Sequence, residues 1–333
     1  MSKILFFGEP LIRITPFHCE KLFDNINSQL YYGGSEVNIA KNMQSLNIET
    51  SILTALPLNS IGDSFLNYLN FNHIDTTHIQ RCGDRLGIYF LINGCGIRNS
   101  EVYYDRHFTS IQNIDISTID MNQLFHEVTH FHFSGITIAI SQNVRDVLLV
   151  LLSEAKKRGI IISIDLNLRT KMISIVDAKK YFSLFAKYAD YCFGIDPLML
   201  NDQDLNMFDR VHATKEMIEK RMKDLIEVYH FKAIFHTVRN IDENEVNSYQ
   251  AYGYSNQLYQ SVEMRTKLLE RVGSGDAFVS GALHQIMNNA SIQDVINFGV
   301  ASGSMKCTLL GDNMSESASS ISSLLESHIE ISR

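Results

Sequence analysis

The chain has no tryptophan, few prolines and no basic run longer than residues 156–158. Its formal net charge is −8, so the basic face typical of nucleic-acid binders is missing and no nucleic-acid partner is expected. The five cysteines are widely spaced and none forms a CxxC pair, which argues against a zinc site or a disulfide framework. Thiols scattered in this way suit a reducing compartment.

Long apolar runs are also lacking. Residues 147–152 form one of the longest, whereas a membrane-spanning helix needs about 20 apolar residues. The apolar stretch at residues 4–8 is too short for a signal peptide. We therefore expect a cytoplasmic protein with no membrane partner. With 45% hydrophobic and 20% charged residues, the chain can bury a large core.

Strand-like and helical stretches alternate along most of the chain. Apolar runs predict strands at residues 4–8, 51–56, 129–133, 160–164, 191–194 and 233–238. Helical spacing of apolar residues predicts helices at about residues 35–46, 63–69, 143–158, 274–288, 292–309 and 319–327. Such alternation indicates an α/β fold with a mostly parallel central sheet and helices on both faces.

Two β-rich segments interrupt this alternation, at about residues 11–32 and 77–110. In the second segment, strands are expected on either side of a turn at residues 93–96. Together the two segments predict a small sheet outside the main body. Residues 242–247 are polar and predict an exposed loop.

The most informative stretch is Arg-Val-Gly-Ser-Gly-Asp-Ala-Phe at residues 271–278. Its glycines allow successive N–H groups to converge at the start of a helix, where they can bind a transferring phosphoryl group. Asp276 follows in the first turn and can either cap the helix or accept a proton from an attacking hydroxyl. The pattern alone does not choose between these two interpretations, and it is not a Walker loop.

The same stretch closely resembles the C-terminal signature of the ribokinase-like (PfkB) carbohydrate kinase family. Residues 32–40, Tyr-Gly-Gly-Ser-Glu-Val-Asn-Ile-Ala, resemble the N-terminal signature of that family. The resemblance covers residues 1–333 and implies a single ribokinase-like domain with three layers, α/β/α, and a small β-sheet lid over the sugar site. It also implies ATP and Mg²⁺ as cofactors and a homo-oligomer formed through the lid.

Within the family, the chain is most similar to the 2-keto-3-deoxygluconate kinases. The similarity lies in residues 8–13, in Tyr-Tyr-Asp-Arg at residues 103–106, in Asp-Leu-Asn-Leu-Arg at residues 165–169 and in residues 306–312. A sugar acid carries a carboxylate, which Arg106 and Arg169 could bind. The resemblance therefore implies phosphorylation of the keto-deoxy acid to its 6-phosphate.

Site residues follow from the resemblance, position by position. Asp276 is expected to be the catalytic base and to contact the sugar. Further sugar contacts are expected from Gly34, Asn38, Tyr89, Tyr104, Arg106, Arg169 and Asp312. Contacts near ATP are expected from Asn167, Arg169, Thr237, Arg239, Gly273, Ser274 and Gly275.

Structural roles remain open for several of these residues. Tyr89 and Tyr104 could pack the lid, Arg169 could serve a structural ion pair, and Asp312 could cap a turn. His130 and His132 alternate along a strand without a third ligand, so they are not expected to bind metal.

The family's Asn-x-x-Glu motif, which helps to organise Mg²⁺, is missing. Asp196 is the carboxylate in the corresponding region, and the metal ligands stay unassigned. The glycines that usually follow the strand near residue 238 are missing too.

Two alternatives to the sugar-acid kinase remain. One is a fructokinase-like or nucleoside kinase of the same family, which would not need two arginines facing its substrate. The other is a non-catalytic sugar-binding relative, against which the intact glycine loop and Asp276 argue.

Overall fold

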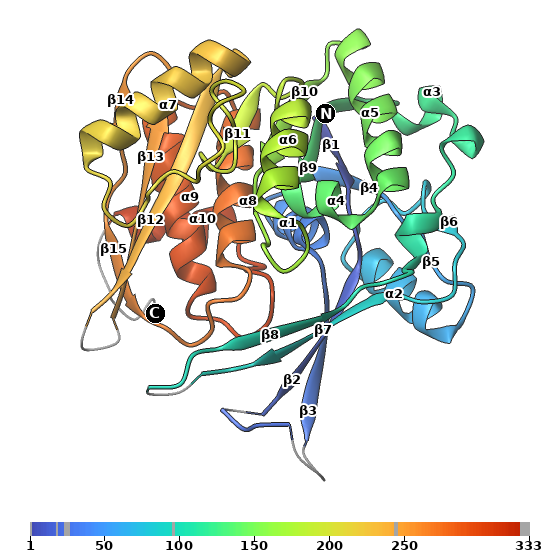
Figure 1. Ribbon diagram of the computed structural model, residues 1–333. Helices are drawn as coiled ribbons and strands as arrows, with labels where there is room; N and C mark the ends of the chain where they lie inside the picture. The colour runs from blue at the N-terminus through green and yellow to red at the C-terminus, as the bar shows by residue number, and fades with distance from the viewer. Residues whose placement is uncertain (1, 18, 23–26, 95–96, 243–245, 327–333) are drawn as a thin grey trace.

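The computed structural model describes residues 2–17, 19–22, 27–94, 97–242 and 246–326, and a nine-stranded sheet lies at its centre (Figure 1). The strand order is β14-β13-β12-β11-β10-β9-β1-β4, and β15 pairs with β13. The strands are β1 (Lys3–Phe7), β4 (Glu49–Leu53), β9 (Val128–Ser134), β10 (Ile161–Asp165), β11 (Tyr191–Phe193), β12 (Ala233–Ile241), β13 (Val246–Tyr254), β14 (Leu258–Gln260) and β15 (Met264–Lys267).

The strands from β4 to β12 run parallel, and β13, β14 and β15 are added to them antiparallel. The parallel strands are buried on both faces, as their continuous apolar runs predict. Neighbouring residues of β1 therefore belong to different cores: Leu5 and Phe7 join one hydrophobic cluster, and Ile4 and Phe6 join the other.

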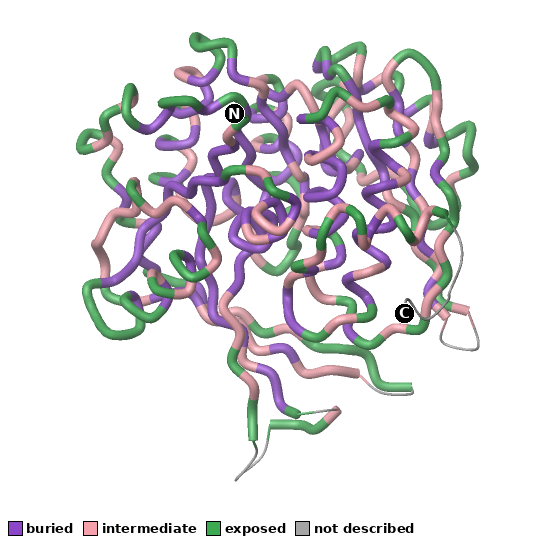
Figure 2. The backbone as a smooth tube through the Cα atoms, turned by 180° about the vertical axis from the view of Figure 1, so that it is seen from behind, coloured by how far each residue is buried: buried purple, intermediate pink, exposed green. Residues whose placement is uncertain are grey.

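Helices cover both faces of this sheet. The first cluster packs against α3 (Met121–Leu124), α4 (Gly135–Ile140), α5 (Gln142–Lys157), α6 (Ile175–Ala186) and α7 (Lys215–Tyr229). The second packs against α1 (Ser35–Ser45), α2 (Ser60–Phe71), α8 (Ser274–Met287), α9 (Ile292–Lys306) and α10 (Ala318–Leu325). This is the predicted three-layer arrangement, and buried residues fill the interior of the main body (Figure 2).

A second sheet, called the lid sheet below, projects from the main body (Figure 1). Its order is β3 (Ser28–Gly33), β2 (Leu11–Pro16), β7 (Gly87–Ile92) and β8 (Glu101–Asp105). β2 pairs antiparallel with β3 and parallel with β7, and β7 pairs antiparallel with β8. Residues 80–81 do not join this sheet, because β6 (Gln80–Arg81) pairs with β5 (Ala55–Leu56).

The region after β12 differs from the sequence-based expectation. Val246 and Asn247 do not belong to an exposed loop but begin β13, and Asn247 is buried. Residues 243–245 of the expected loop, residues 95–96 of the expected lid turn and Ser327 of the last expected helix lie outside the described residues.

Short 3₁₀ turns, η1 (Ser110–Asn113) and η2 (Ile116–Thr118), lead from the lid sheet towards α3. No helix within the described ranges has both the length and the apolar character that crossing a bilayer requires.

Candidate active site

Asp276 lies in the first turn of α8, and hydrogen bonds connect it to the start of α1. Its carboxylate oxygens accept the Ser35 hydroxyl at 3.0 Å and the Asn38 side-chain N–H at 2.7 Å. The Asn167 side chain donates to the same Ser35 hydroxyl at 3.2 Å. Both glycine signatures and the segment at residues 165–169, which are distant in sequence, therefore meet at one carboxylate.

This meeting point lies at the carboxyl ends of the parallel strands. Asp165 ends β10, and Ser134 ends β9 and donates its backbone N–H to Glu36 of α1 at 2.9 Å. Ligands of open α/β sheets bind at this edge of the sheet. The predicted site residues are thus gathered where the fold places a binding site.

The environment of Asp276 prepares its carboxyl group to exchange a proton. Burial raises the pKa of Asp276 to about 7, against the opposing effect of the Asn38 hydrogen bond, and the Asp165 carboxylate raises this pKa further. The Asp276 side chain is still partly exposed, so a ligand can reach it. A carboxylate that titrates near neutral pH is suited to act as a general base.

Of the three residues before Asp276, Gly273 caps α8, and Ser274 and Gly275 are the first two residues of the helix. Gly273 has a φ of +78°, and a Cβ at this position would overlap the carbonyl oxygen of Asp312. A Cβ at Gly275 would meet no protein atom within 4 Å. Gly273 is therefore required by the fold, whereas Gly275 faces open space in front of the helix N-terminus.

Arg239 brings a positive charge to this turn. Its Nη1 donates to the Ser274 hydroxyl at 2.7 Å, and its guanidinium lies 4.0 Å from the ring centroid of Tyr249. Thr237 lies two residues earlier in β12 and, by strand alternation, on the same face of the sheet. Of these two residues, both predicted to lie near ATP, Arg239 contacts the start of α8 directly.

Gly34 precedes α1 with a φ of +119°, and a Cβ there would overlap the backbone oxygen of Glu9. Only glycine fits this position. The preceding residue, Gly33, lies beneath two polar side chains: a Cβ at Gly33 would come within 2.7 Å of Asp312 Oδ2 and within 3.1 Å of Asn38 Oδ1. That Asn38 oxygen is buried and accepts no hydrogen bond from a described residue.

Asp312 and Tyr89 connect the main body to the lid sheet. The Tyr89 hydroxyl donates to Asp312 Oδ2 at 2.9 Å, and the carboxylate also faces the Arg13 guanidinium. Tyr104 lies opposite Tyr89 in the lid sheet, with the ring centroids 6.3 Å apart. These predicted sugar-binding residues therefore lie together on one side of the lid sheet.

Arg106 is engaged differently from its predicted role. It is buried and forms an ion pair with the Glu9 carboxylate, and its Nη1 lies 2.9 Å from Met172 Sδ. Thr109 donates its hydroxyl to the same Glu9 side chain at 2.5 Å. The charge of Arg106 is therefore already balanced within the protein.

Arg169 contrasts with Arg106. Its side chain is exposed, and within the described part of the chain it forms no ion pair. Its charge opposes the effect of burial, which raises the pKa of Asp165 to about 7. The Arg169 guanidinium donates to the Leu168 backbone oxygen at 3.3 Å, and its charge acts on the carboxyl groups of both Asp165 and Asp276.

Sequence analysis assigned no role to Ser35 or Asp165. One Asp165 oxygen accepts the Asn167 backbone N–H at 3.2 Å, and the other accepts no hydrogen bond from a described residue. The signal for Asp165 was a carboxylate at the end of a buried strand. For Ser35 it was a hydroxyl directly after the glycine pair.

The described residues contain no cluster of three or more His, Cys, Asp or Glu side chains that could hold a metal ion by themselves. The Asp196 carboxylate accepts the Phe208 backbone N–H at 3.1 Å and lies 3.5 Å from Arg210 Nε, so both of its oxygens already contact protein groups. As expected, His132 serves the sheet: its Nδ1 is hydrogen-bonded to the Ser163 hydroxyl.

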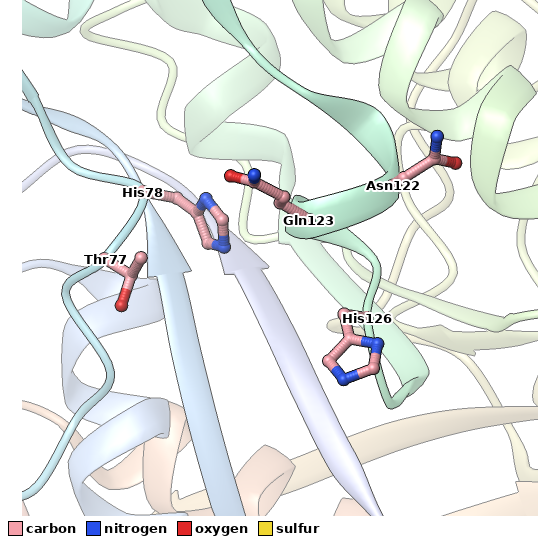
Figure 3. A pocket seen from close by; sticks show the side chains of 5 residues that line it. All are labelled: Thr77, His78, Asn122, Gln123 and His126. Carbon is pink, nitrogen blue, oxygen red and sulfur yellow. The ribbon is translucent and has the colours of Figure 1, made fainter.

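A surface hollow lies away from this site (Figure 3). It is lined by Thr77, His78, Asn122, Gln123 and His126. The charge of Lys3 acts on His78, which places the hollow near the amino end of β1, at the opposite edge of the sheet. None of the predicted site residues lines it.

The fold and the site together define an α/β phosphotransferase that acts on an alcohol group. The model of the pfkB family carbohydrate kinases matches residues 1–318, and the chain belongs to this family. The predicted ribokinase-like fold class is therefore confirmed.

Relatives across the whole chain agree with this assignment. The 2-dehydro-3-deoxygalactonokinase of Haloferax volcanii is 23% identical over 312 residues, which cover 93% of this chain and 92% of the relative. A crystal structure of 2-dehydro-3-deoxygluconokinase from Thermotoga maritima matches with a TM-score of 0.90 and 27% identity, covering 98% of each chain.

A structure described as a ribokinase II of E. coli in complex with ATP and Mg²⁺ matches with a TM-score of 0.77 and 20% identity. It covers 98% of this chain and 100% of that chain, and at this identity it shows the shared fold. The chain is thus a sugar kinase of the pfkB family that is similar to the 2-dehydro-3-deoxygluconokinases.

Proposed function

We propose that the protein transfers the γ-phosphoryl group of ATP to the terminal hydroxyl of 2-keto-3-deoxygluconate (2-dehydro-3-deoxygluconate), forming the 6-phosphate. The observation that carries this proposal is the position of Asp276. It lies at the N-terminus of α8, behind an open glycine turn, and hydrogen bonds to Ser35 and Asn38 hold it. A proton acceptor and an anion site are thereby adjacent.

In this mechanism Asp276 takes the proton of the attacking hydroxyl as phosphoryl transfer proceeds. Two hydrogen bonds fix its carboxylate, so the base is oriented before the substrate arrives. The N–H groups at the start of α8 and the Arg239 guanidinium stabilise the charge on the transferring group. Open space in front of Gly275 lets the phosphate approach the backbone.

ATP brings Mg²⁺ to such a reaction, and the residues present fit this ion. Mg²⁺ usually binds through one or two carboxylates together with substrate phosphates and water, so no cage of protein ligands is needed. Asp165 fits this role, because one of its oxygens accepts no hydrogen bond from a described residue. The ion would neutralise charge on the phosphates.

The exposed guanidinium of Arg169, which has no carboxylate partner among the described residues, supports an acidic substrate. An exposed arginine beside two carboxyl groups can bind a substrate carboxylate with two parallel hydrogen bonds. The pairing of Arg106 with Glu9 favours the alternative, a neutral-sugar kinase, because only one of the two arginines expected to bind the acid then lacks a carboxylate partner among the described residues. The similarity to 2-dehydro-3-deoxygluconokinases supports the acid as substrate.

A coupled assay of ADP release with a substrate panel tests this proposal. We expect 2-keto-3-deoxygluconate to be phosphorylated with a higher kcat/KM than fructose, ribose or a nucleoside. ADP release with fructose but not with the acid would identify a neutral-sugar kinase. Binding of the acid without turnover of any panel member would identify a sugar-binding relative.

We also propose that two copies associate through the outer face of the lid sheet. Leu30, Ile14, Phe90 and Tyr103 lie opposite one another and form an apolar row across its four strands. Leu30 and Tyr103 are exposed, and Ile14 and Phe90 are partly exposed. Sedimentation velocity should detect a dimer in the wild type and a monomer in Leu30→Glu.

A further inference from the structure

The opposite face of the lid sheet carries a row of three tyrosines and one arginine. Tyr31, Arg13, Tyr89 and Tyr104 lie opposite one another on β3, β2, β7 and β8. Arg13 is fully buried, with 0% of its surface exposed, so this row faces the main body. A charged side chain is rarely buried so completely unless it is paired.

Arg13 is paired with two carboxylates from the C-terminal part of the chain. Its Nη1 donates to Glu270, and its Nε lies 3.1 Å from Asp312 Oδ1. The guanidinium also lies 4.1 Å from the ring centroid of Tyr31. The second Glu270 oxygen accepts the Gly311 backbone N–H at 2.7 Å, so both carboxylates are fixed to the same short segment.

These partners border the active site. Glu270 lies shortly before the glycine turn, and the Asp312 backbone packs so closely against Gly273 that no Cβ fits between them. The Asp312 carboxylate accepts the Tyr89 hydroxyl and lies above Gly33 together with Asn38. Arg13 thus lies directly against Asp312, which the sequence predicts to contact the sugar.

We propose that Arg13 is a positioning residue for sugar binding: it keeps Asp312 ionised and oriented towards the sugar hydroxyls from its buried place in the lid sheet. This inference rests on the proposed function and adds a specific residue to it. An ionised Asp312 can accept hydrogen bonds from both Tyr89 and the sugar, whereas a protonated one would use an oxygen as a donor.

The charges around Asp312 show why Arg13 matters. Burial raises the pKa of Asp312, the Arg13 charge is the largest opposing influence, and Glu270 adds to the effect of burial. The other titratable groups that act on or respond to Asp312 come from four elements: Lys306 of α9, Lys41 of α1, Tyr68 of α2, and Tyr31 and Tyr89 of the lid sheet.

Loss of Arg13 should therefore raise the pKa of Asp312 further and favour its protonated form. The Arg13→Met variant should show a sugar KM higher by roughly tenfold to a hundredfold, the range for losing one charge-assisted hydrogen bond. This KM should fall as the pH is raised, because a higher pH favours the ionised form of Asp312. Arg13→Lys keeps the charge and should show a smaller, pH-independent increase.

Three controls separate positioning from folding. The double variant Arg13→Met/Glu270→Gln avoids the unpaired buried carboxylate that could unfold the single variant, and it should show the same pH-dependent KM. Arg158→Met removes an arginine from a surface pair with Glu154 and should leave both KM values unchanged. The KM for ATP should change by less than roughly twofold in all Arg13 variants.

Two results would overturn the inference while the wild type is active. One is an unchanged sugar KM in Arg13→Met and in the double variant. The other is a KM raised equally at every pH and not improved in Arg13→Lys, which indicates a purely structural role. If the wild type neither binds nor phosphorylates the acid, the proposal that the acid is the substrate is wrong. The Arg13 variants are then compared with the wild type on the panel member that is turned over. If no panel member binds, the inference fails as well.

Discussion

Replacing Asp276 with asparagine should lower turnover strongly and remove its dependence on acidic pH, while the fold is kept. Asparagine has nearly the same shape, its amide oxygen can accept the Asn38 N–H, and its amide N–H can donate to the Ser35 hydroxyl. Both contacts of the wild-type carboxylate, at 2.7 and 3.0 Å, can therefore persist. Only the capacity to take a proton is lost.

The raised pKa sets the size of the pH effect. With a pKa of about 7 for Asp276, the ionised fraction falls about tenfold per unit below pH 7. The kcat/KM of the wild type for the sugar should fall in the same way, because this parameter reports the free enzyme's base. Asp276→Asn should lower kcat by roughly 10²- to 10⁴-fold, the usual contribution of a general base, and leave a flat profile.

The same pKa predicts a change in stability. Because the folded-state pKa of Asp276 is raised above its ordinary value of 3.8, the native state holds a proton that the unfolded state releases between these pH values. Stability from this group therefore falls as the pH rises towards 7. Asp276→Asn removes that cost, so its Tm should exceed the wild-type Tm at pH 8 and approach it near pH 4.

Steady-state kinetics and thermal unfolding of both proteins between pH 5 and pH 9 check these expectations. Near-native turnover of Asp276→Asn would remove Asp276 from its role as base. An acid limb that persists in the residual activity of the variant would assign the titration to another group, and Asp165, whose pKa is also raised by burial to about 7, would be the next residue to test.

Two further predictions concern the nucleotide side of the site. Gly273→Ala should lower the free energy of unfolding by at least about 2 kcal/mol, because of its positive φ and the overlap with the Asp312 carbonyl oxygen. Gly275→Ala, which has open space around the new Cβ, should unfold like the wild type but bind ATP more weakly. Thermal and chemical unfolding check this contrast, and equal stabilities of the Gly273→Ala and Gly275→Ala variants would contradict it. Arg239→Met should raise the KM for ATP about tenfold and leave the sugar KM unchanged, since one charge-assisted contact is lost. Initial rates measured with ATP varied and then with the sugar varied give both KM values. An unchanged KM for ATP would place Arg239 outside the nucleotide site.

Local patterns allowed much of the fold and part of the site to be predicted. Gly273 before α8 and Gly34 before α1 are recognisable because positive φ values and close backbone approaches demand glycine there. Continuous apolar runs identified the buried parallel strands, because strands covered on both faces need apolar side chains on both faces. In these places a few adjacent residues carry the whole signal.

The antiparallel part of the central sheet carried a weaker signal. Buried and partly buried residues alternate along β13, but Asn247 and Gly253 occupy inward positions that apolar side chains usually fill. The polar composition therefore indicated a loop. Pairing with β12 on one side and with β14 and β15 on the other is what makes this segment a strand.

Ion pairs between distant residues could not be predicted from the sequence. Arg13 and Glu270 are separated by 257 positions, and Arg106 and Glu9 by 97. The sequence supplied arginines for a sugar acid, but only the three-dimensional contacts show that Arg106 is neutralised while Arg169 is not. Which charge is available to a ligand depends on such partners.

The most direct test of the central claim is the identity of the product. The wild-type protein is incubated with ATP, Mg²⁺ and 2-keto-3-deoxygluconate, and the mixture is followed by phosphorus NMR and mass spectrometry. We predict one ADP for each sugar acid consumed and a phosphate monoester at the terminal carbon. ADP without a sugar phosphate, phosphate on another carbon, or an unchanged sugar acid would contradict the account.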